Sequence, residues 1–233
     1  MGDWLAKTAQ RFVAAFVTED RWLLYVKGFG ITVEIAFFAA IIGVLLGTVV
    51  ALMKLHKGKD GDKSILNSIA DVYIDIIRGT PSVLQLLIMW FIIMKSTNNG
   101  VLVATLSFGI NSGAYVAEII RAGILAVDKG QTEAGRSLGL SSAQTLRYIV
   151  LPQAFKNALP PLGNEFIVLL KETAIVGYVS LSDLTRVANQ IASRTYDAFM
   201  PLIGAAVIYL IAVKLLTMLF AMIERRMRQG DNR

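Results

Sequence analysis

The chain has 233 residues, of which 55% are hydrophobic and only 17% are charged, and its mean hydropathy is +0.59. This composition excludes a disordered chain and argues against a soluble globular enzyme, because ordinary soluble domains carry roughly 25% charged residues. The absence of cysteine excludes disulfides, thiolate metal sites and cysteine nucleophiles, and the single histidine, His56, lies in a polar stretch typical of a solvated loop.

The N-terminal residues 1–25 are predicted to form an interfacial amphipathic helix. Apolar side chains fall on one helical face and polar ones elsewhere: Leu5, Ala9, Phe12, Val13 and Phe16 against Lys7, Gln10 and Arg11. Such a helix lies on the membrane surface with its apolar face in the lipid, and a loosely ordered tail is the alternative. The beginning of the chain lacks the basic start and compact apolar run of a secretory signal peptide.

Five membrane spans are predicted within a transmembrane domain at 26–224, since a spanning helix needs about 20 mostly apolar residues. The predicted spans are 28–53, 64–94, 101–127, 162–181 and 199–223. Gly79-Thr80-Pro81 interrupts the second span, and the fourth is the weakest because it contains Lys171 and Glu172. The fold class is therefore an all-α membrane protein, with a loop at 128–161 and a basic tail at 225–233.

The distribution of basic residues predicts the topology. The connecting segments on one side of the five spans hold twelve Lys and Arg, and those on the other side hold seven. The positive-inside rule places the N-terminus outside and the C-terminal Arg225-Arg226 in the cytoplasm. The same distribution accounts for the net charge of +6 without a nucleic-acid partner.

Ten charged residues fall inside the predicted spans: Glu34, Asp71, Asp75, Arg78, Glu118, Arg121, Glu165, Lys171, Glu172 and Lys214. A lipid-exposed charge at mid-membrane costs ~2.5–3.5 kcal/mol, so most of them must pair, lie near headgroups or face a polar interior. Lys214 is expected to snorkel towards the inner interface, and Glu34 is expected near the outer one.

The spacing of the remaining charges predicts how they are arranged. One polar stripe on a helix consists of Asn67, Asp71, Asp75 and Arg78. Glu118 and Arg121 are three residues apart and can pair, and Glu165 and Glu172 are seven apart and share a face. The candidate pathway for a charged solute is Arg78, Glu118, Arg121, Glu165 and Glu172. The alternative is that these charges only join helices to one another.

Small residues recur every four positions in two predicted spans: Ala39, Gly43, Gly47 and Ala51 in the first, and Gly109, Gly113 and Ala117 in the third. Such stripes let helix backbones approach closely in lipid, within one chain or between chains. Five helices with so many polar interior residues are not expected to enclose a pathway alone, so we predict a dimer.

The long loop at 128–161 has its own structural signals. Gln131–Leu138 suit a short helix, Gly139 suits a left-handed C-cap, and Ser141 with Gln144 forms a capping box that opens a second helix. Pro152, Pro160 and Pro161 punctuate the rest of the loop. The loop therefore predicts a helix–glycine–helix elbow, which suits docking of another protein. An amphipathic loop resting on the membrane is the alternative.

This loop resembles the Glu-Ala-Ala signature of permease subunits of ATP-binding-cassette (ABC) importers. Glu133-Ala134-Gly135, Gly139 and Ile149-Val150-Leu151-Pro152 match its spacing, with Gly135 where the family prefers alanine. The resemblance implies that the loop couples to a cytoplasmic ATPase. The implied coupling residues are Glu133, Ala134, Gly135, Gly139, Leu151 and Pro152.

Further segments resemble the branch of that family that imports polar amino acids of the histidine, glutamate, glutamine, arginine and cystine type. They are Arg78-Gly79-Thr80-Pro81 with Gln85, Ala117–Gly123, Gly130–Ala134, Asn164-Glu165 and Leu169–Thr173. The resemblance implies a type I importer permease in a bacterial inner (plasma) membrane. It also implies an ATPase dimer that binds ATP and Mg²⁺, a second permease copy or homologous permease, an extracytoplasmic solute-binding protein and an amino acid substrate.

The chain itself is not expected to be an enzyme or to bind a cofactor or metal. It has no Gly-x-x-x-x-Gly-Lys-Ser/Thr phosphate loop, no His-Glu-x-x-His and no Gly-x-Ser-x-Gly sequence. Within the predicted pathway, Arg78 is the candidate for a substrate carboxylate, and Glu165 or Glu118 for an ammonium group. The alternative functions are an ion-coupled secondary transporter of a small polar solute and, less in keeping with the sequence, a membrane-embedded enzyme or scaffold.

Overall fold

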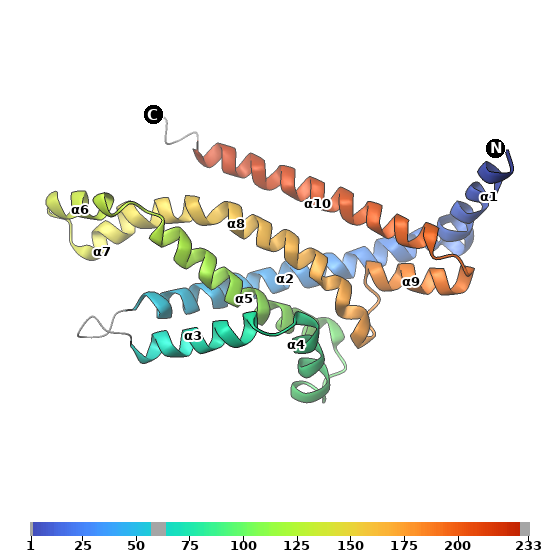
Figure 1. The fold of residues 1–233 in the computed structure, drawn as a ribbon, viewed down its shortest axis with the longest axis horizontal. Helices are drawn as coiled ribbons and strands as arrows, with labels where there is room; N and C mark the ends of the chain where they lie inside the picture. Colours follow the sequence, from blue (N-terminus) through green and yellow to red (C-terminus); the bar gives the residue numbers. More distant parts are fainter. Residues whose placement is uncertain (1, 57–63, 229–233) are drawn as a thin grey trace.

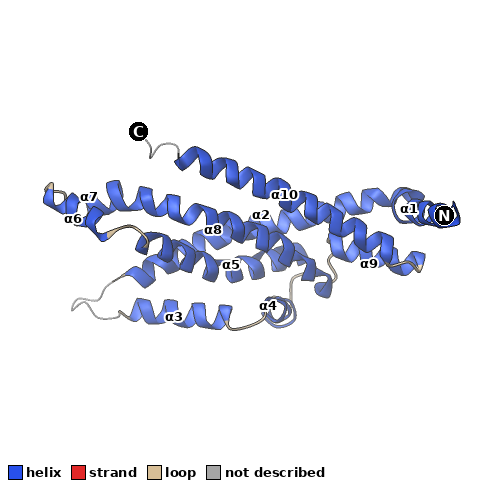
Figure 2. Ribbon diagram, turned by 45° about the horizontal axis from the view of Figure 1, so that its top comes forward, coloured by secondary structure: helices blue, strands red, loops and turns tan. Residues whose placement is uncertain are grey.

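The computed structural model describes residues 2–56 and 64–228, in which every regular element is helical (Figures 1 and 2). The α-helices are α1 (Gly2–Phe12), α2 (Arg21–Leu55), α3 (Ile65–Arg78), α4 (Ser82–Ile88), α5 (Gly100–Leu125), α6 (Lys129–Ser137), α7 (Ser142–Thr145), α8 (Leu151–Glu172), α9 (Leu184–Thr195) and α10 (Phe199–Arg228). Shorter π or 3₁₀ segments are η1 (Val13–Val17), η2 (Thr18–Asp20), η3 (Met89–Ile93), η4 (Leu146–Val150) and η5 (Thr173–Val179). Residues 57–63, within the predicted connection at 54–63, and residues 229–233, within the predicted tail at 225–233, lie outside the described residues.

Among the described residues, three helices are long and apolar enough to cross a membrane by themselves: α2 counted together with the N-terminal segment, α5 and α10. The pair formed by α3 and the α4–η3 segment is also long and apolar enough, as one span bent by 102°. The bend falls at Gly79-Thr80-Pro81, where the sequence predicts an interruption. Helix α8 lies beside these spans but is less apolar, and its average hydrophobicity is the lowest of the four long helices.

The fourth predicted span differs from the observed helix. The sequence predicts a span at 162–181, but α8 begins at Leu151 and ends at Glu172, after which η5 takes a tighter course. Pro160 and Pro161 lie inside α8 instead of ending it. The helix continues past them because it is packed against α5: a Cβ added at Gly123 would lie 2.9 Å from the carbonyl oxygen of Ala154. Tertiary packing here overrides the helix-breaking tendency of proline.

The most extensive contact between helices is the one between α2 and α5. A Cβ added at Gly47 of α2 would lie 2.6 Å from Cγ1 of Val116, and one added at Gly109 of α5 would lie 2.7 Å from Cβ of Ile42. The small-residue stripes of the two helices therefore face each other, and they join helices within this chain.

The two ends of the molecule carry different elements. Figures 1 and 2 show α6 and α7 at one end and α1 and α9 at the other, with α10 running back towards the end of α6 and α7. Helix α9 is held by Asp183, whose buried side chain accepts hydrogen bonds from the backbone N–H of Thr185 (2.9 Å) and Arg186 (3.0 Å). At the N-terminus, α1 ends at Phe12, and the last five residues of the predicted 1–25 helix belong to α2, where Tyr25 is buried. Trp4, Leu5 and Phe12 are exposed on α1.

Candidate functional site

The predicted elbow in the 128–161 loop is present. Helix α6 is capped by Asp128, which accepts a hydrogen bond from the backbone N–H of Gly130 at 2.7 Å. Gly139 follows at φ +82°, a left-handed conformation that glycine adopts without strain. Ser141 and Gln144 form the predicted capping box, with the Ser141 N–H donating to Oε1 of Gln144 at 2.9 Å. We call residues 128–150 the elbow.

All but one of the predicted coupling residues are exposed. Glu133 and Ala134 are exposed on α6, and Leu151 and Pro152 are exposed at the start of α8. Gly135 is buried inside the elbow, where an added Cβ would lie 2.8 Å from Cδ1 of Ile149 and 2.9 Å from Cγ2 of Thr145. The elbow therefore has little room for a Cβ at this position, which explains glycine where the family that the loop resembles prefers alanine.

A cavity of about 480 Å³ lies between α3, α5 and α8. Its lining residues are Arg78, Tyr115, Glu118, Ile119, Ala122, Gly123, Ala126, Asn157, Pro161 and Glu165. It unites three of the five predicted pathway residues, Arg78, Glu118 and Glu165. We call this space the cavity.

Specific contacts hold the polar side chains of the cavity. The Arg78 guanidinium lies 5.2 Å from the centroid of the Tyr115 ring, within the range of a cation–π contact. Oε1 of half-buried Glu165 accepts a hydrogen bond from Oγ of Ser112 at 2.8 Å. Sequence reasoning missed Tyr115, although it lies three residues before Glu118 and so shares its helix face.

The break before α4 is held in place by Gln85, a residue of the amino-acid-importer resemblance. Its Nε2 donates to the carbonyl oxygen of Ile77 and to Oγ1 of Thr80, both at 2.8 Å. Its Oε1 accepts a hydrogen bond from Nδ2 of Asn111 on α5 at 2.9 Å. Because the break directly follows Arg78, these contacts fix the end of α3 that carries this residue.

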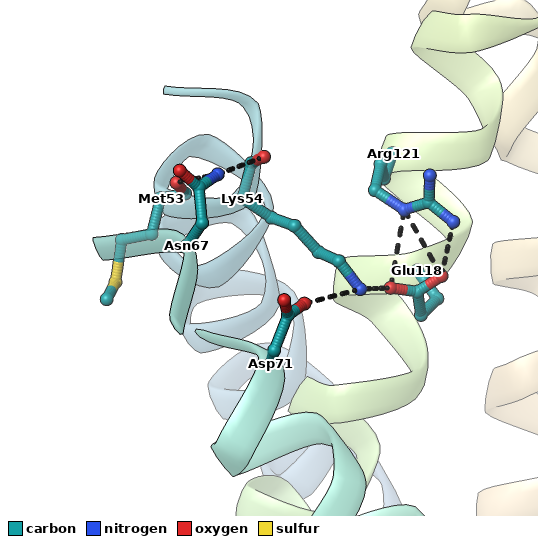
Figure 3. Close-up of polar contacts among 6 residues, drawn as sticks. All are labelled: Met53, Lys54, Asn67, Asp71, Glu118 and Arg121. Carbon is teal, nitrogen blue, oxygen red and sulfur yellow. Dashed lines mark hydrogen bonds and ion pairs between the residues drawn. The ribbon is translucent and has the colours of Figure 1, made fainter. Parts of the chain in front are cut away.

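Glu118 also belongs to a group of charges shared by three helices (Figure 3). Nζ of Lys54, from the end of α2, lies 2.6 Å from Oε1 of Glu118 and 3.2 Å from Oδ1 of Asp71 on α3. Arg121 donates to Glu118 through Nη2 at 2.8 Å and through Nε at 3.2 Å, which confirms the predicted pair. We call Lys54, Asp71, Glu118 and Arg121 the ion cluster. Sequence reasoning placed Lys54 in a loop and gave no signal of its role.

The predicted polar stripe on α3 does not act as one unit. Asn67 joins the helix ends: its Nδ2 donates to the carbonyl oxygens of Lys54 (2.7 Å) and Met53 (3.3 Å), as Figure 3 shows. Asp71 lies in the ion cluster, the side chain of Asp75 is exposed, and Arg78 lines the cavity. The residues of the stripe share one helix face, but those near the start of α3 contact the end of α2, whereas Arg78 at its end lines the cavity.

Two of the predicted pathway residues do not line the cavity. Arg121 contacts Glu118 from outside the lining, and Glu172 lies two turns beyond Glu165 along α8. Glu172 is half-buried and has no hydrogen-bond partner among the described residues. No group of three or more His, Cys, Asp or Glu in the described part of the chain is arranged to hold a metal ion.

Apolar spanning helices, a cavity between them that is lined by three charged side chains and a structured elbow at one end are the features of a membrane transport component. Residues 43–229 match the family described as binding-protein-dependent transport system inner membrane component. The chain belongs to this family, so the predicted resemblance and the all-α permease fold are confirmed, and the chain is the permease component of a transport system, not its ATPase.

Several transport permeases are similar to this chain over nearly its whole length. It is 41% identical over 208 residues to the arginine transport system permease protein ArtQ of Bacillus subtilis, covering 88% of this chain and 93% of the relative. It is 36% identical over 214 residues to the L-cystine transport system permease protein TcyB of the same organism, covering 91% and 89%. It is 34% identical over 209 residues to the glutamine transport system permease protein GlnP of Escherichia coli, covering 88% and 93%.

Solved structures agree with the fold. The crystal structure of an amino acid ABC transporter with histidines matches with a TM-score of 0.79 and 46% identity, covering 87% of this chain and 94% of that chain. An inward-facing structure of the methionine ABC transporter MetNI matches with a TM-score of 0.77 at 21% identity, covering 90% and 99%. The second match supports the fold alone.

Proposed function

We propose that this chain is the permease subunit of an ATP-driven importer of polar amino acids and that it forms the translocation pathway by alternating access. The observation that carries this proposal is the cavity, in which a cation, Arg78, and an anion, Glu165, line one space. An amino acid is a zwitterion and needs both signs of charge along its way. The relatives named for arginine, cystine and glutamine support the substrate class.

Within the cavity, Arg78 is the proposed partner of the substrate carboxylate and Glu165 of the ammonium group. Glu165 accepts a hydrogen bond from Ser112 and keeps further acceptor capacity. Glu118 is the weaker candidate because Lys54 and Arg121 already engage it. Arg121 and Glu172 are proposed to support the pathway from outside the cavity, Arg121 by orienting Glu118.

The elbow is proposed as the docking element for a cytoplasmic ATPase dimer, which would bind ATP and Mg²⁺. Its exposed residues Glu133 and Ala134, together with Leu151 and Pro152, would face the partner, and Gly135 and Gly139 would keep the elbow in shape. A motion of the elbow reaches the cavity directly, because η4 leads without a break into α8, which carries Glu165.

The orientation and the remaining partners follow from this assignment. The elbow and the tail at 225–233 would lie in the cytoplasm, and α9 and the N-terminus would lie outside, where a solute-binding protein delivers the amino acid. Helix α1, the first part of the predicted 1–25 segment, would rest on the outer membrane interface. A second copy of the chain or a homologous permease would complete the pathway, because in the described part of the chain the cavity is lined from one side, by α3, by α8 and by α5 with its C-cap Ala126.

Uptake of radiolabelled amino acids by cells that express the transporter tests the role of the cavity. Glu165→Gln is expected to reduce uptake at least tenfold, because it removes the anion that receives the ammonium group. Asp75→Asn is the matched control, since the Asp75 side chain is exposed outside the cavity. Unchanged uptake of every amino acid in Glu165→Gln would overturn this assignment.

The energy source distinguishes an ATP-driven importer from the alternative, an ion-coupled secondary transporter. Collapse of the proton gradient while cellular ATP is maintained is expected to leave uptake intact. Loss of uptake under that condition would favour the ion-coupled mechanism.

A further inference from the structure

Lys54 does not line the cavity, but it touches a residue that does. Its Nζ lies 2.6 Å from Oε1 of Glu118, and Glu118 is the member of the ion cluster that appears in the cavity lining. Only 22% of the Lys54 side chain and 20% of the Glu118 side chain are exposed, so water screens this contact weakly. The charge of Lys54 therefore acts on the cavity through Glu118.

The position of the Lys54 ammonium group is held from two directions. The ammonium group forms ion pairs with the carboxylates of Asp71 and Glu118, and the backbone carbonyl of Lys54 accepts a hydrogen bond from Nδ2 of Asn67 at 2.7 Å. Oδ1 of Asn67 accepts in turn from the backbone N–H of Ser64 at 2.6 Å. These contacts distinguish Lys54 from a surface lysine, whose long side chain samples many positions.

The formal charges explain what Lys54 contributes. The cavity lining carries one cation, Arg78, and two anions, Glu118 and Glu165. The rest of the ion cluster adds Lys54, Arg121 and Asp71, which brings the combined charge of lining and cluster to zero. Loss of Lys54 leaves one uncompensated negative charge beside the cavity, and loss of the Asp71 charge leaves one positive charge.

We propose that Lys54, acting through Glu118, is a positioning residue that sets the charge selectivity of the cavity between neutral and cationic amino acids. Its ammonium group neutralises an anion of the cavity wall and so disfavours a substrate with a net positive charge. Asp71 has the opposite effect, because its carboxylate neutralises part of the ammonium charge and so favours a substrate with a net positive charge. This inference rests on the proposed amino acid transport and concerns the same cavity.

Equilibrium binding of radiolabelled arginine and glutamine to the full-length chain in lipid nanodiscs tests the proposal without a contribution from the external binding protein. Lys54→Gln is expected to raise the preference for arginine over glutamine on the order of tenfold, because a unit negative charge is uncovered close to the ligand. Asp71→Asn is expected to lower that preference. Lys54→Arg keeps the charge and is expected to retain the original preference.

The double variant separates charge from shape. Lys54→Gln with Asp71→Asn restores the formal charge while both ionic contacts are lost, so the preference is expected to return to that of the unchanged chain. A preference that stays shifted in the double variant would overturn the proposal, as would an unchanged preference in both single variants. If Lys54→Gln does not fold, Asp71→Asn alone decides, because its shift has the opposite sign.

Glu165→Gln distinguishes failure of this inference from failure of the proposed function. Loss of binding in Glu165→Gln combined with no shift in the Lys54 and Asp71 variants would remove the role of Lys54 and leave the cavity assignment intact. Unchanged binding of both amino acids in Glu165→Gln would remove the cavity assignment, and the role of Lys54 with it.

Discussion

The elbow and the ion cluster are both polar, yet they are built in opposite ways. The capping contacts of the elbow join residues two or three positions apart, such as Asp128 with Gly130 and Ser141 with Gln144. The ion cluster joins Lys54 to Glu118, which is 64 residues away, across three helices. A local motif therefore suffices to build the docking element, whereas the charges beside the cavity depend on how the helices pack.

The largest loss of stability is expected from a substitution that disturbs the packing of α2 against α5, which supports the ion cluster. Gly47→Val places a side chain where a Cβ alone would lie 2.6 Å from Val116 and 2.8 Å from a backbone oxygen of Gly113, so a loss of about 3 kcal/mol in stability is expected. Gly30→Val is the matched control in the same helix, because an added Cβ there meets nothing within 4 Å. Thermal unfolding in detergent measures both, and equal losses would contradict the packing argument.

Glu118 and Glu165 should respond differently to the same substitution. Glu118→Gln is expected to lower stability by about 2 kcal/mol, because Lys54 and Arg121 lose a shared partner in a partly buried site. Glu165→Gln is expected to leave the unfolding temperature nearly unchanged while uptake falls. Thermal unfolding beside uptake measurements checks the contrast, and a larger loss of stability for Glu165→Gln would reverse it.

The elbow should lose its partner without losing its shape. Glu133→Lys reverses an exposed charge and is expected to reduce co-purification of the ATPase about tenfold, with a change in stability below about 0.5 kcal/mol. Asp3→Lys makes the same reversal at the other end of the molecule and serves as the control. Full recovery of the ATPase with Glu133→Lys would show that this face does not dock.

The smallest expected effect concerns the turn of the elbow. Gly139→Ala places a Cβ on a residue at φ +82° and is expected to destabilise the elbow by about 1 kcal/mol. Gly139→Asn should cost less, because asparagine tolerates the left-handed region. Faster hydrogen exchange of the backbone amides near the turn measures the effect. Equal exchange in both variants and the unchanged chain would contradict it.

Much of the fold and part of the site could be predicted from the sequence. The break at Gly79-Thr80-Pro81, the elbow with its glycine, and the Glu118–Arg121 pair all rest on neighbours within a few positions. The start of α8 could not be predicted in the same way. Pro160 and Pro161 indicate breaks by their local chemistry, but packing against α5 carries the helix through them.

The sequence by itself determined four of the five predicted apolar spans, the elbow and the family, because hydrophobic runs, caps and short-range motifs act within a few residues of one another. Only the tertiary structure decided which charges meet. It separated Arg78 and Glu165 in the cavity from Lys54 and Asp71 in the ion cluster, and it placed Glu118 in both. The physical reason is that a buried charge is stabilised by whichever partner packing brings within reach, and helical periodicity predicts a face but not the neighbour that covers it.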